Sequence, residues 1–190
     1  MKNWLAGTFL VVCGVLAGSG LTLRWQRGVL SGASDQQSAL PTMDSLPTEV
    51  ARLKSLVPSQ SHAMMDVQFH WTNLWFAAQH KNWPLAQFYF DESRQHITWM
   101  IRIRPVRQGP DGKDVDLRGI FSGIDNSSLA AVKEAIEQKD GAKFATSYKT
   151  MLESCYACHK ASGKPYLRPM IPESPDQSII SFDPDATWPQ

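Results

Sequence analysis

Residues 155–159 read CYACH, which places two of the chain's three cysteines three positions apart and a histidine directly after the second. This motif limits the possible structures more than any other feature, because its three side chains lie within five residues and must belong to one site. A thioredoxin-type redox pair belongs in a βαβ unit, but the chain has almost no strand pattern. A tetrahedral zinc site needs more ligands, and the remaining cysteine, Cys13, lies in an apolar N-terminal segment.

The adjacent histidine favours a third explanation, covalent attachment of haem. One helical turn points the two thiols at the two vinyl groups of one porphyrin edge, while the neighbouring imidazole binds the iron. Chance matches to the motif are expected on the order of 0.001 times in a chain of this composition. We therefore expect one covalently bound haem c, with Cys155 and Cys158 as attachment points and His159 as the proximal iron ligand.

The N-terminal segment is apolar, since no charged residue follows Lys2 until Arg24. A run of about 20 residues is long enough to span a bilayer, whereas the apolar core of a signal peptide usually has about 7 to 15. This length favours an uncleaved signal anchor over residues 1–27. The alternative is a signal peptide cleaved near the small residues 17–19. Either way, we expect the rest of the chain on the periplasmic side of a bacterial inner membrane, anchored or soluble.

Three further segments differ in composition. Residues 28–60 are rich in Ser, Gln, Pro and Gly and predict a flexible linker with at most a turn or two of helix. Residues 61–162 carry the helical periodicity of a folded domain. Residues 163–190 contain six prolines and predict an extended tail.

Apolar residues recur at helical spacing in four stretches of the central segment. The expected helices begin at Ser61, after a cap at Asn82, at about residue 126, and after Asp140. The second ends at Pro105, the third at about residue 139 and the fourth at about Ala161. Residues 108–124 predict a loop, and the strand-like segment IRIRPVR before them has no evident partner strand.

Four helices of similar length predict an all-α fold, an antiparallel four-helix bundle with an N-terminal transmembrane or signal helix and a proline-rich tail. In such a bundle the last helix lies antiparallel beside the first. The motif near the end of the last helix is therefore expected close to the start of the first.

A helical bundle with Cys-x-x-Cys-His near the end of its last helix resembles the cytochrome c-prime family, including its low-spin relatives. The resemblance covers about residues 61–161. It implies thioether bonds at Cys155 and Cys158 and a proximal bond from His159. The tail of about 30 residues after the motif departs from the family, whose chains usually stop much sooner.

The second axial ligand of the iron decides the function. An iron bound only by His159 is open to small gases, whereas a second protein ligand closes it and suits electron transfer. Met64 and Met65 lie at the start of the first helix, where the low-spin relatives use a methionine. The alternatives are His70, Met170 in the tail, an open iron, and methionines that only fill the core.

The expected function is therefore that of a membrane-tethered mono-haem c-type cytochrome, an electron carrier rather than an enzyme, with Trp71 and Trp75 packing the core and the haem. A five-coordinate haem protein that binds NO or CO, and a cytochrome subunit of a larger membrane oxidoreductase, remain alternatives. The expected partners are redox proteins or such a complex. A net charge of +1 without a run of basic residues excludes a nucleic-acid surface.

Overall fold

The computed structural model of the 190-residue chain describes residues 43–176 and 179–187. Within these ranges the chain is mainly helical, with one two-stranded sheet. It divides into two compact units, residues 1–56 and 57–190. The anchor or signal segment predicted for residues 1–27 lies outside the described residues. None of the helices in the described ranges combines the length and the apolar character of a membrane span.

The first unit contains a short 3-10 helix, η1 (Met43–Ser45), followed by α2 (Leu46–Leu56). None of the residues of α2 is buried. Arg52 donates to both carboxylate oxygens of Glu49, at 2.8 and 2.7 Å, one turn earlier on this helix. The helix is longer than the turn or two expected from the sequence, because its Ala, Leu, Arg and Lys residues all favour helix.

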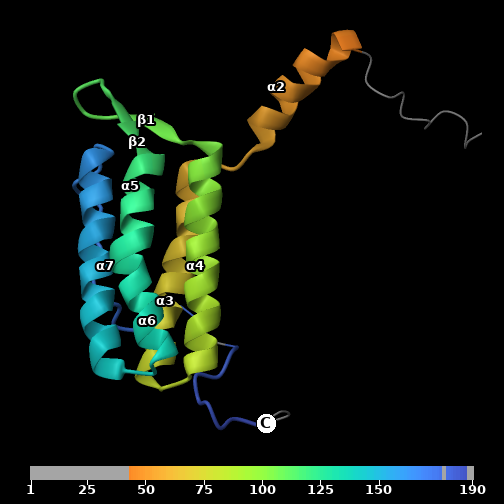
Figure 1. Ribbon diagram of the computed structural model, residues 1–190. Helices are drawn as coiled ribbons and strands as arrows, with labels where there is room; N and C mark the ends of the chain where they lie inside the picture. Colours follow the sequence, from red (N-terminus) through yellow and green to blue (C-terminus); the bar gives the residue numbers. More distant parts are fainter. Residues whose placement is uncertain (1–42, 177–178, 188–190) are drawn as a thin grey trace, which may run out of the picture. The chain divides into compact units, whose positions relative to one another are not determined.

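The second unit begins with a pair of long helices, α3 (Gln60–Gln79) and α4 (Trp83–Ile103), which lie side by side and run in opposite directions (Figure 1). The connection between them is short, and Lys81 within it takes a left-handed conformation with φ 59°. Asn82 caps α4 by accepting a hydrogen bond from the backbone N–H of Leu85 at 3.2 Å. The cap and helix predicted from the sequence are confirmed here.

The prediction that residues 108–124 form a loop is wrong. Val106–Gln108 (β1) pairs antiparallel with Asp114–Asp116 (β2), and α5 (Leu117–Ile124) follows directly. The sequence contains the partner that the strand-like segment needed, but β2 has only three residues and a single apolar one, Val115. Such a short strand gives too little alternation to be recognised.

A single helical column continues from α5 through a π-helical turn, η2 (Asp125–Leu129), into α6 (Ala130–Glu137). The column begins at Leu117 rather than at about residue 126. Asp116 caps it by accepting hydrogen bonds from two backbone N–H groups, those of residues 118 and 119, at 3.0 and 3.1 Å. This Asp cap precedes two glycines, at 119 and 123, which weaken the helical pattern in the sequence.

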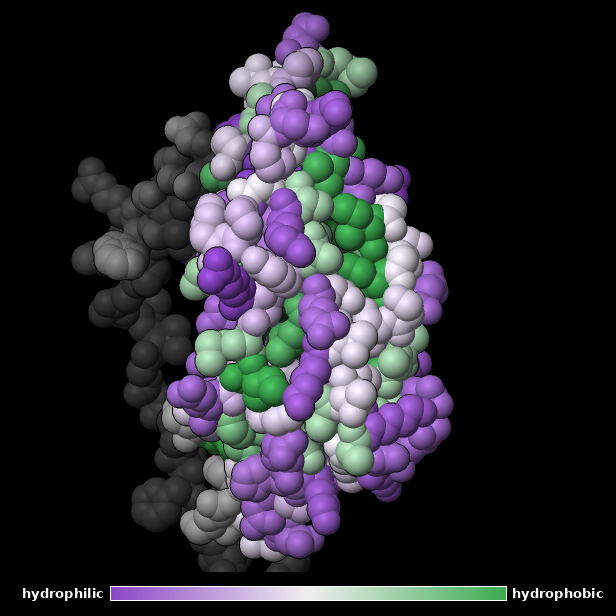
Figure 2. Space-filling model, turned by 90° about the vertical axis from the view of Figure 1, so that its left-hand side faces the viewer, coloured by the Kyte–Doolittle hydropathy of each residue, from purple (hydrophilic) through white to green (hydrophobic). Residues whose placement is uncertain are grey.

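The last helix, α7 (Gly141–Ala161), begins after Asp140 as predicted, and Asp140 caps it by accepting a 2.9 Å bond from the N–H of Lys143. α6 packs against both α4 and α7, and α7 also contacts α3. The described part of the tail beyond Ala161 contains no helix or strand, as its prolines predict. On the face that Figure 2 shows, polar residues predominate and hydrophobic ones gather in small separate patches.

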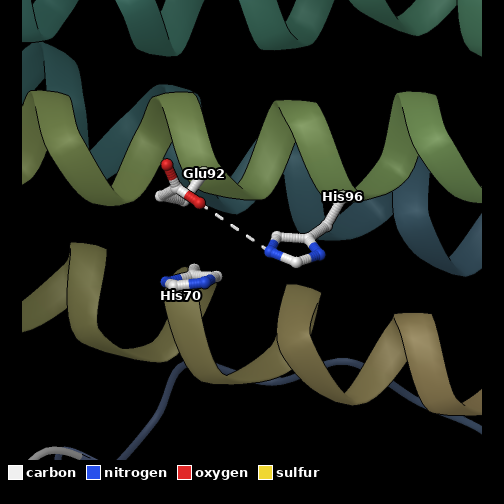
Figure 3. Close-up of side chains that lie close together, drawn as sticks. All are labelled: His70, Glu92 and His96. Atoms are coloured by element: carbon white, nitrogen blue, oxygen red, sulfur yellow. Dashed lines mark ion pairs between the residues drawn. The ribbon is translucent and has the colours of Figure 1, made fainter. Parts of the chain in front are cut away.

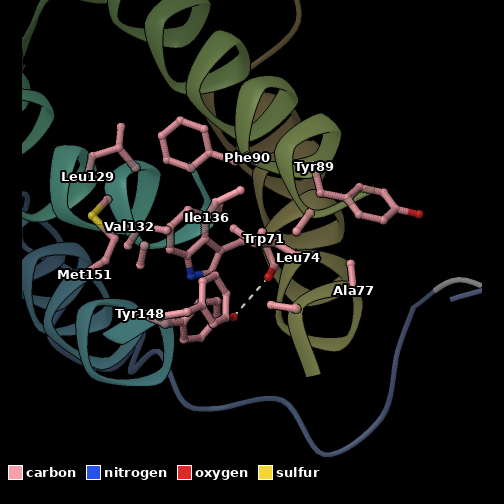
Figure 4. Packing of buried hydrophobic residues seen from close by; sticks show 14 residues of the cluster. Trp71, Leu74, Ala77, Tyr89, Phe90, Leu129, Val132, Ile136, Tyr148 and Met151 are labelled. Carbon is pink, nitrogen blue, oxygen red and sulfur yellow. Dashed lines mark hydrogen bonds between the residues drawn. The ribbon is translucent and has the colours of Figure 1, made fainter. Parts of the chain in front are cut away.

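Two clusters of buried apolar residues form the core. In the larger one, Trp71 stacks on Tyr148 with ring centroids 5.1 Å apart, and the Tyr148 hydroxyl donates to the Trp71 carbonyl at 3.0 Å (Figure 4). This contact joins α3 to α7. The smaller cluster joins the start of α3, the end of α4 and the start of α5. Its buried members are Ala63, Val67, Ile97, Met100, Ile101 and Leu117.

Candidate functional site

The two cysteines of the motif lie one turn apart in the last part of α7, and both side chains are partly buried. Cys155 packs against the larger core cluster. Cys158 packs against the smaller one. The helix therefore turns both thiols toward the interior of the second unit, and the pair spans the boundary between the two clusters.

The surroundings keep both thiols protonated. Burial, and after it the neighbouring Cys158, raises the pKa of Cys155 to about 12. Burial also raises the pKa of Cys158, although a hydrogen bond with Ser162 acts against it. A catalytic dithiol needs a lowered pKa, because the thiolate is the nucleophile. The burial of the two thiols thus disfavours a redox pair. Both sulfur atoms instead pack against apolar side chains of the two core clusters, which together form an apolar wall.

His159 is oriented by the segment that follows the helix. Its Nδ1 lies 2.8 Å from the backbone carbonyl oxygen of Leu167. A carbonyl can only accept, so Nδ1 carries the proton and Nε2 keeps the lone pair with which an imidazole binds metal. The chain closes back here because the N–H of Lys164 donates to the His159 carbonyl and the N–H of Leu167 donates to the Lys164 carbonyl.

The hydroxyl of Tyr156 reinforces this closure by donating to the Pro165 carbonyl at 3.2 Å. Residues 164–167 carry no motif that predicts this contact. The only local signal was Gly163, whose φ of 73° allows the chain to reverse after the helix. The identity of the carbonyl that meets His159 depends on the path of the tail.

The structure distinguishes the two methionines of the first helix. Met64 packs against the same small cluster as Cys158, so α3 brings its side chain toward the motif. Met65 is 63% exposed. Successive residues of a helix point about 100° apart, so only one of the pair can face the cluster. Of the two predicted candidates, only Met64 packs against the cluster that Cys158 also contacts.

The other two candidate ligands lie elsewhere among the described residues. The aromatic neighbours of the His70 ring are Phe69, Phe88, Tyr89 and His96. All of these residues belong to α3 or α4, so His70 lies at the interface of these two helices. Met170 is in the tail and is 64% exposed.

Trp71 and Trp75 both contribute to the core near the motif. Trp71 stacks on Tyr148, and the Trp75 ring centroid lies 4.9 Å from that of Tyr148, about two turns before Cys155 on α7. The indole Nε1 of Trp71 is buried without a hydrogen-bond partner among the described residues. The two indoles thus extend the apolar wall that Cys155 joins.

Comparisons with known proteins identify no relative, because no family model, no curated protein and no solved structure matches the chain. The interpretation of the site therefore depends on its own geometry.

Proposed function

We propose that the protein is a mono-haem c-type cytochrome of the cytochrome c-prime type that transfers single electrons. Cys155 and Cys158 would hold haem c through thioether bonds, and Nε2 of His159 would bind the iron. The observation that carries the proposal is the hydrogen bond between His159 Nδ1 and the Leu167 carbonyl, which in the neutral imidazole leaves the lone pair on Nε2, in a helical turn whose two thiols pack against the core clusters. Haem supplies the one-electron chemistry when it is bound.

The residues around the motif fit this group. Two thiols one turn apart match the two attachment points along a porphyrin edge, and their apolar surroundings suit a large flat apolar ring. The raised pKa of Cys155 makes its thiol a poor nucleophile in the folded chain. The thioether bonds would therefore form before α7 packs into the core.

The Leu167 carbonyl would orient His159 as a ligand. It fixes the imidazole tautomer and the ring orientation, as a carbonyl or carboxylate behind a metal-bound histidine generally does. The tail after the motif would thus help to position the proximal ligand.

The distal ligand in this proposal is Met64. Its thioether sulfur would bind the iron together with His159 and would raise the reduction potential relative to two histidine ligands. Met64 packs against the buried apolar cluster that contains Ala63, Val67 and Leu117. A second protein ligand in apolar surroundings would favour electron transfer over the binding of small gases.

We also propose that α3, α4, the α5–α6 column and α7 form the antiparallel four-helix bundle of this protein type. Residues 1–27 would anchor it at the periplasmic face of a bacterial inner membrane or direct its export. Its partners would then be redox proteins or a membrane oxidoreductase that accept or donate one electron.

Absorption spectra of the haem-loaded full chain test the proposal with a matched pair of variants. Wild-type protein is expected to be low-spin in both redox states. Met64→Ala should become high-spin and bind CO promptly when reduced, because the sixth position opens. Met65→Ala should keep the low-spin spectrum, because that side chain faces solvent.

Three results decide between the alternatives. A colourless chain with the mass of the bare polypeptide, after expression with an intact haem-ligation system, would refute haem attachment. A low-spin spectrum retained in Met64→Ala would refute this ligand. A wild-type spectrum that is high-spin and changes at once with CO would instead support a five-coordinate gas-binding protein.

A further inference from the structure

The interface between α3 and α4 carries two pairs of metal-binding residue types at matching spacing. Asp66 and His70 are four residues apart on α3, and Glu92 and His96 are four residues apart on α4. Residues four apart lie on one face of a helix. Because α3 and α4 pack side by side, the two pairs meet across the interface.

Three of these side chains converge on one point. One potential ligand atom from each of His70, Glu92 and His96 lies within 4.8 Å of the other two. Nε2 of His96 is 3.8 Å from Oε2 of Glu92, and the two imidazole centroids are 5.2 Å apart. Figure 3 shows all three side chains in the space between the two helices.

Asp66 lies on the other side of the His96 ring. Its Oδ2 is 3.6 Å from Nδ1 of His96, while Nε2 points toward Glu92. A carboxylate facing the distant nitrogen of a histidine is the arrangement that orients metal-bound histidines in many proteins. Asp66 thus fits an orienting role rather than that of a fourth ligand.

His70 has an unused nitrogen. Its Nδ1 is buried and has no hydrogen-bond partner among the described residues. Burial, and after it the neighbouring His96, lowers the pKa of His70, against the opposing effect of Glu92 and Asp66. The buried, unpartnered nitrogen is available as a ligand atom.

We propose that His70, Glu92 and His96 bind one divalent transition-metal cation of the Zn²⁺ class, with Asp66 orienting His96. Two imidazoles and a carboxylate form a donor set that suits Zn²⁺, and they leave the fourth tetrahedral position to water. This site shares no residue with the Cys155–His159 motif. Its occupation therefore does not depend on the haem proposal.

The required movements are small. Atoms at most 4.8 Å apart lie about 2.8 Å or less from a common centre, so each must move by roughly 0.7 Å to reach the usual Zn–N and Zn–O distances. The side chains of His96 and Glu92 are 27% and 32% exposed, which leaves room for this adjustment. An open hollow of about 480 Å³ along α4 has Glu92 and His96 in its lining.

Zinc binding to the full haem-loaded chain tests the inference, measured by calorimetric titration and by metal analysis after equilibrium dialysis. One Zn²⁺ per chain is expected. His70→Ala and His96→Ala should each weaken binding by more than about 100-fold, and Asp66→Asn by about 10-fold, the usual cost of losing an orienting carboxylate. The control is His80→Ala, which removes an exposed histidine just after α3 and should leave binding unchanged.

Two further variants separate loss of the zinc ligands from misfolding and from loss of haem. Glu92→Gln keeps the size of the side chain and should also weaken binding, which covers the case in which a histidine variant fails to fold. The double variant Cys155→Ser with Cys158→Ser cannot attach haem but should still bind Zn²⁺ at the α3–α4 interface. Less than half an equivalent of Zn²⁺ on the wild-type chain, or equal binding by wild type and Glu92→Gln, would overturn the proposal.

Discussion

Removal of the Tyr148 hydroxyl tests the contact that joins α7 to α3. The residue is 1% exposed, and its hydroxyl donates to the Trp71 carbonyl at 3.0 Å. Its ring stacks on Trp71 and packs against Trp75. Tyr148→Phe keeps the ring and its packing and deletes only the hydrogen bond between the two helices.

The expected cost at pH 7 is that of one buried hydrogen bond. We expect the free energy of unfolding to fall by about 1 kcal/mol, whereas Tyr148→Ala should cost about 3 to 5 kcal/mol, because it also leaves a cavity. The smaller change corresponds to a decrease in melting temperature of about 3 to 5 °C for a unit of this size. Tyr166→Phe, at a residue that is 68% exposed, serves as the control and should change neither quantity.

The same substitution should reverse its effect at alkaline pH. Burial, and after it Cys155, raises the pKa of Tyr148 far above its ordinary value of 10. The neutral hydroxyl therefore stabilises the fold fully below pH 10, and this contribution is lost as the pH rises, because the unfolded chain ionises first. The loss is about 1.4 kcal/mol per pH unit above pH 10, so the Phe variant should match or exceed the wild type at pH 11.

Urea unfolding followed by far-ultraviolet circular dichroism at pH 7, 10 and 11 gives the comparison, with both proteins in the same haem-loaded state. A loss below about 0.3 kcal/mol at pH 7 would mean that the hydrogen bond adds little to stability. A variant that keeps the same deficit at every pH would contradict the argument from burial.

Two further predictions concern the thiols and the tail. In chain prepared without haem ligation, iodoacetamide at pH 8 should alkylate Cys155 at least about 100-fold more slowly in the folded state than in urea, because burial suppresses the thiolate. In the haem-loaded chain that cysteine should stay unlabelled even in urea, and labelling there, detected by peptide mass spectrometry, would contradict a thioether. Phe182→Ala should lower the free energy of unfolding by about 1 to 2 kcal/mol and speed proteolysis of the tail, since the ring packs against Phe76 and Tyr89. An unchanged urea midpoint would show that the tail does not stabilise the second unit.

Local signals in the sequence were sufficient to predict features that depend only on residues close together along the chain. Asn82 caps α4 as predicted, and α7 begins after Asp140 as predicted, because a capping side chain bonds to the backbone of the first turn of its own helix. The spacing of Cys155 and Cys158 places both thiols one turn apart on any helix. These features depend on neighbours along the chain and not on the rest of the fold.

Pairing between distant segments was not predictable in the same way. The segment IRIRPVR, residues 101–107, was not expected to form a strand for want of a partner, but its last two residues belong to β1, whose partner is three residues at 114–116 with a single apolar side chain. The cap at Asp116 was present in the sequence, but the two glycines after it concealed the start of α5. A strand this short is stabilised by its pairing with the neighbouring strand and cannot be recognised without it.

Spacing along the chain was enough to predict that two sulfur atoms and one imidazole lie close together near the end of a helix. Which other groups face this site depends on how the helices and the tail pack. Met64 rather than Met65 packs against the cluster that Cys158 also contacts, because that choice depends on how α3 is rotated about its axis. His70 meets His96 because two helices pack, and Leu167 meets His159 because the tail turns back. Contacts between separate elements result from tertiary packing, so they cannot be predicted from residue spacing along the chain.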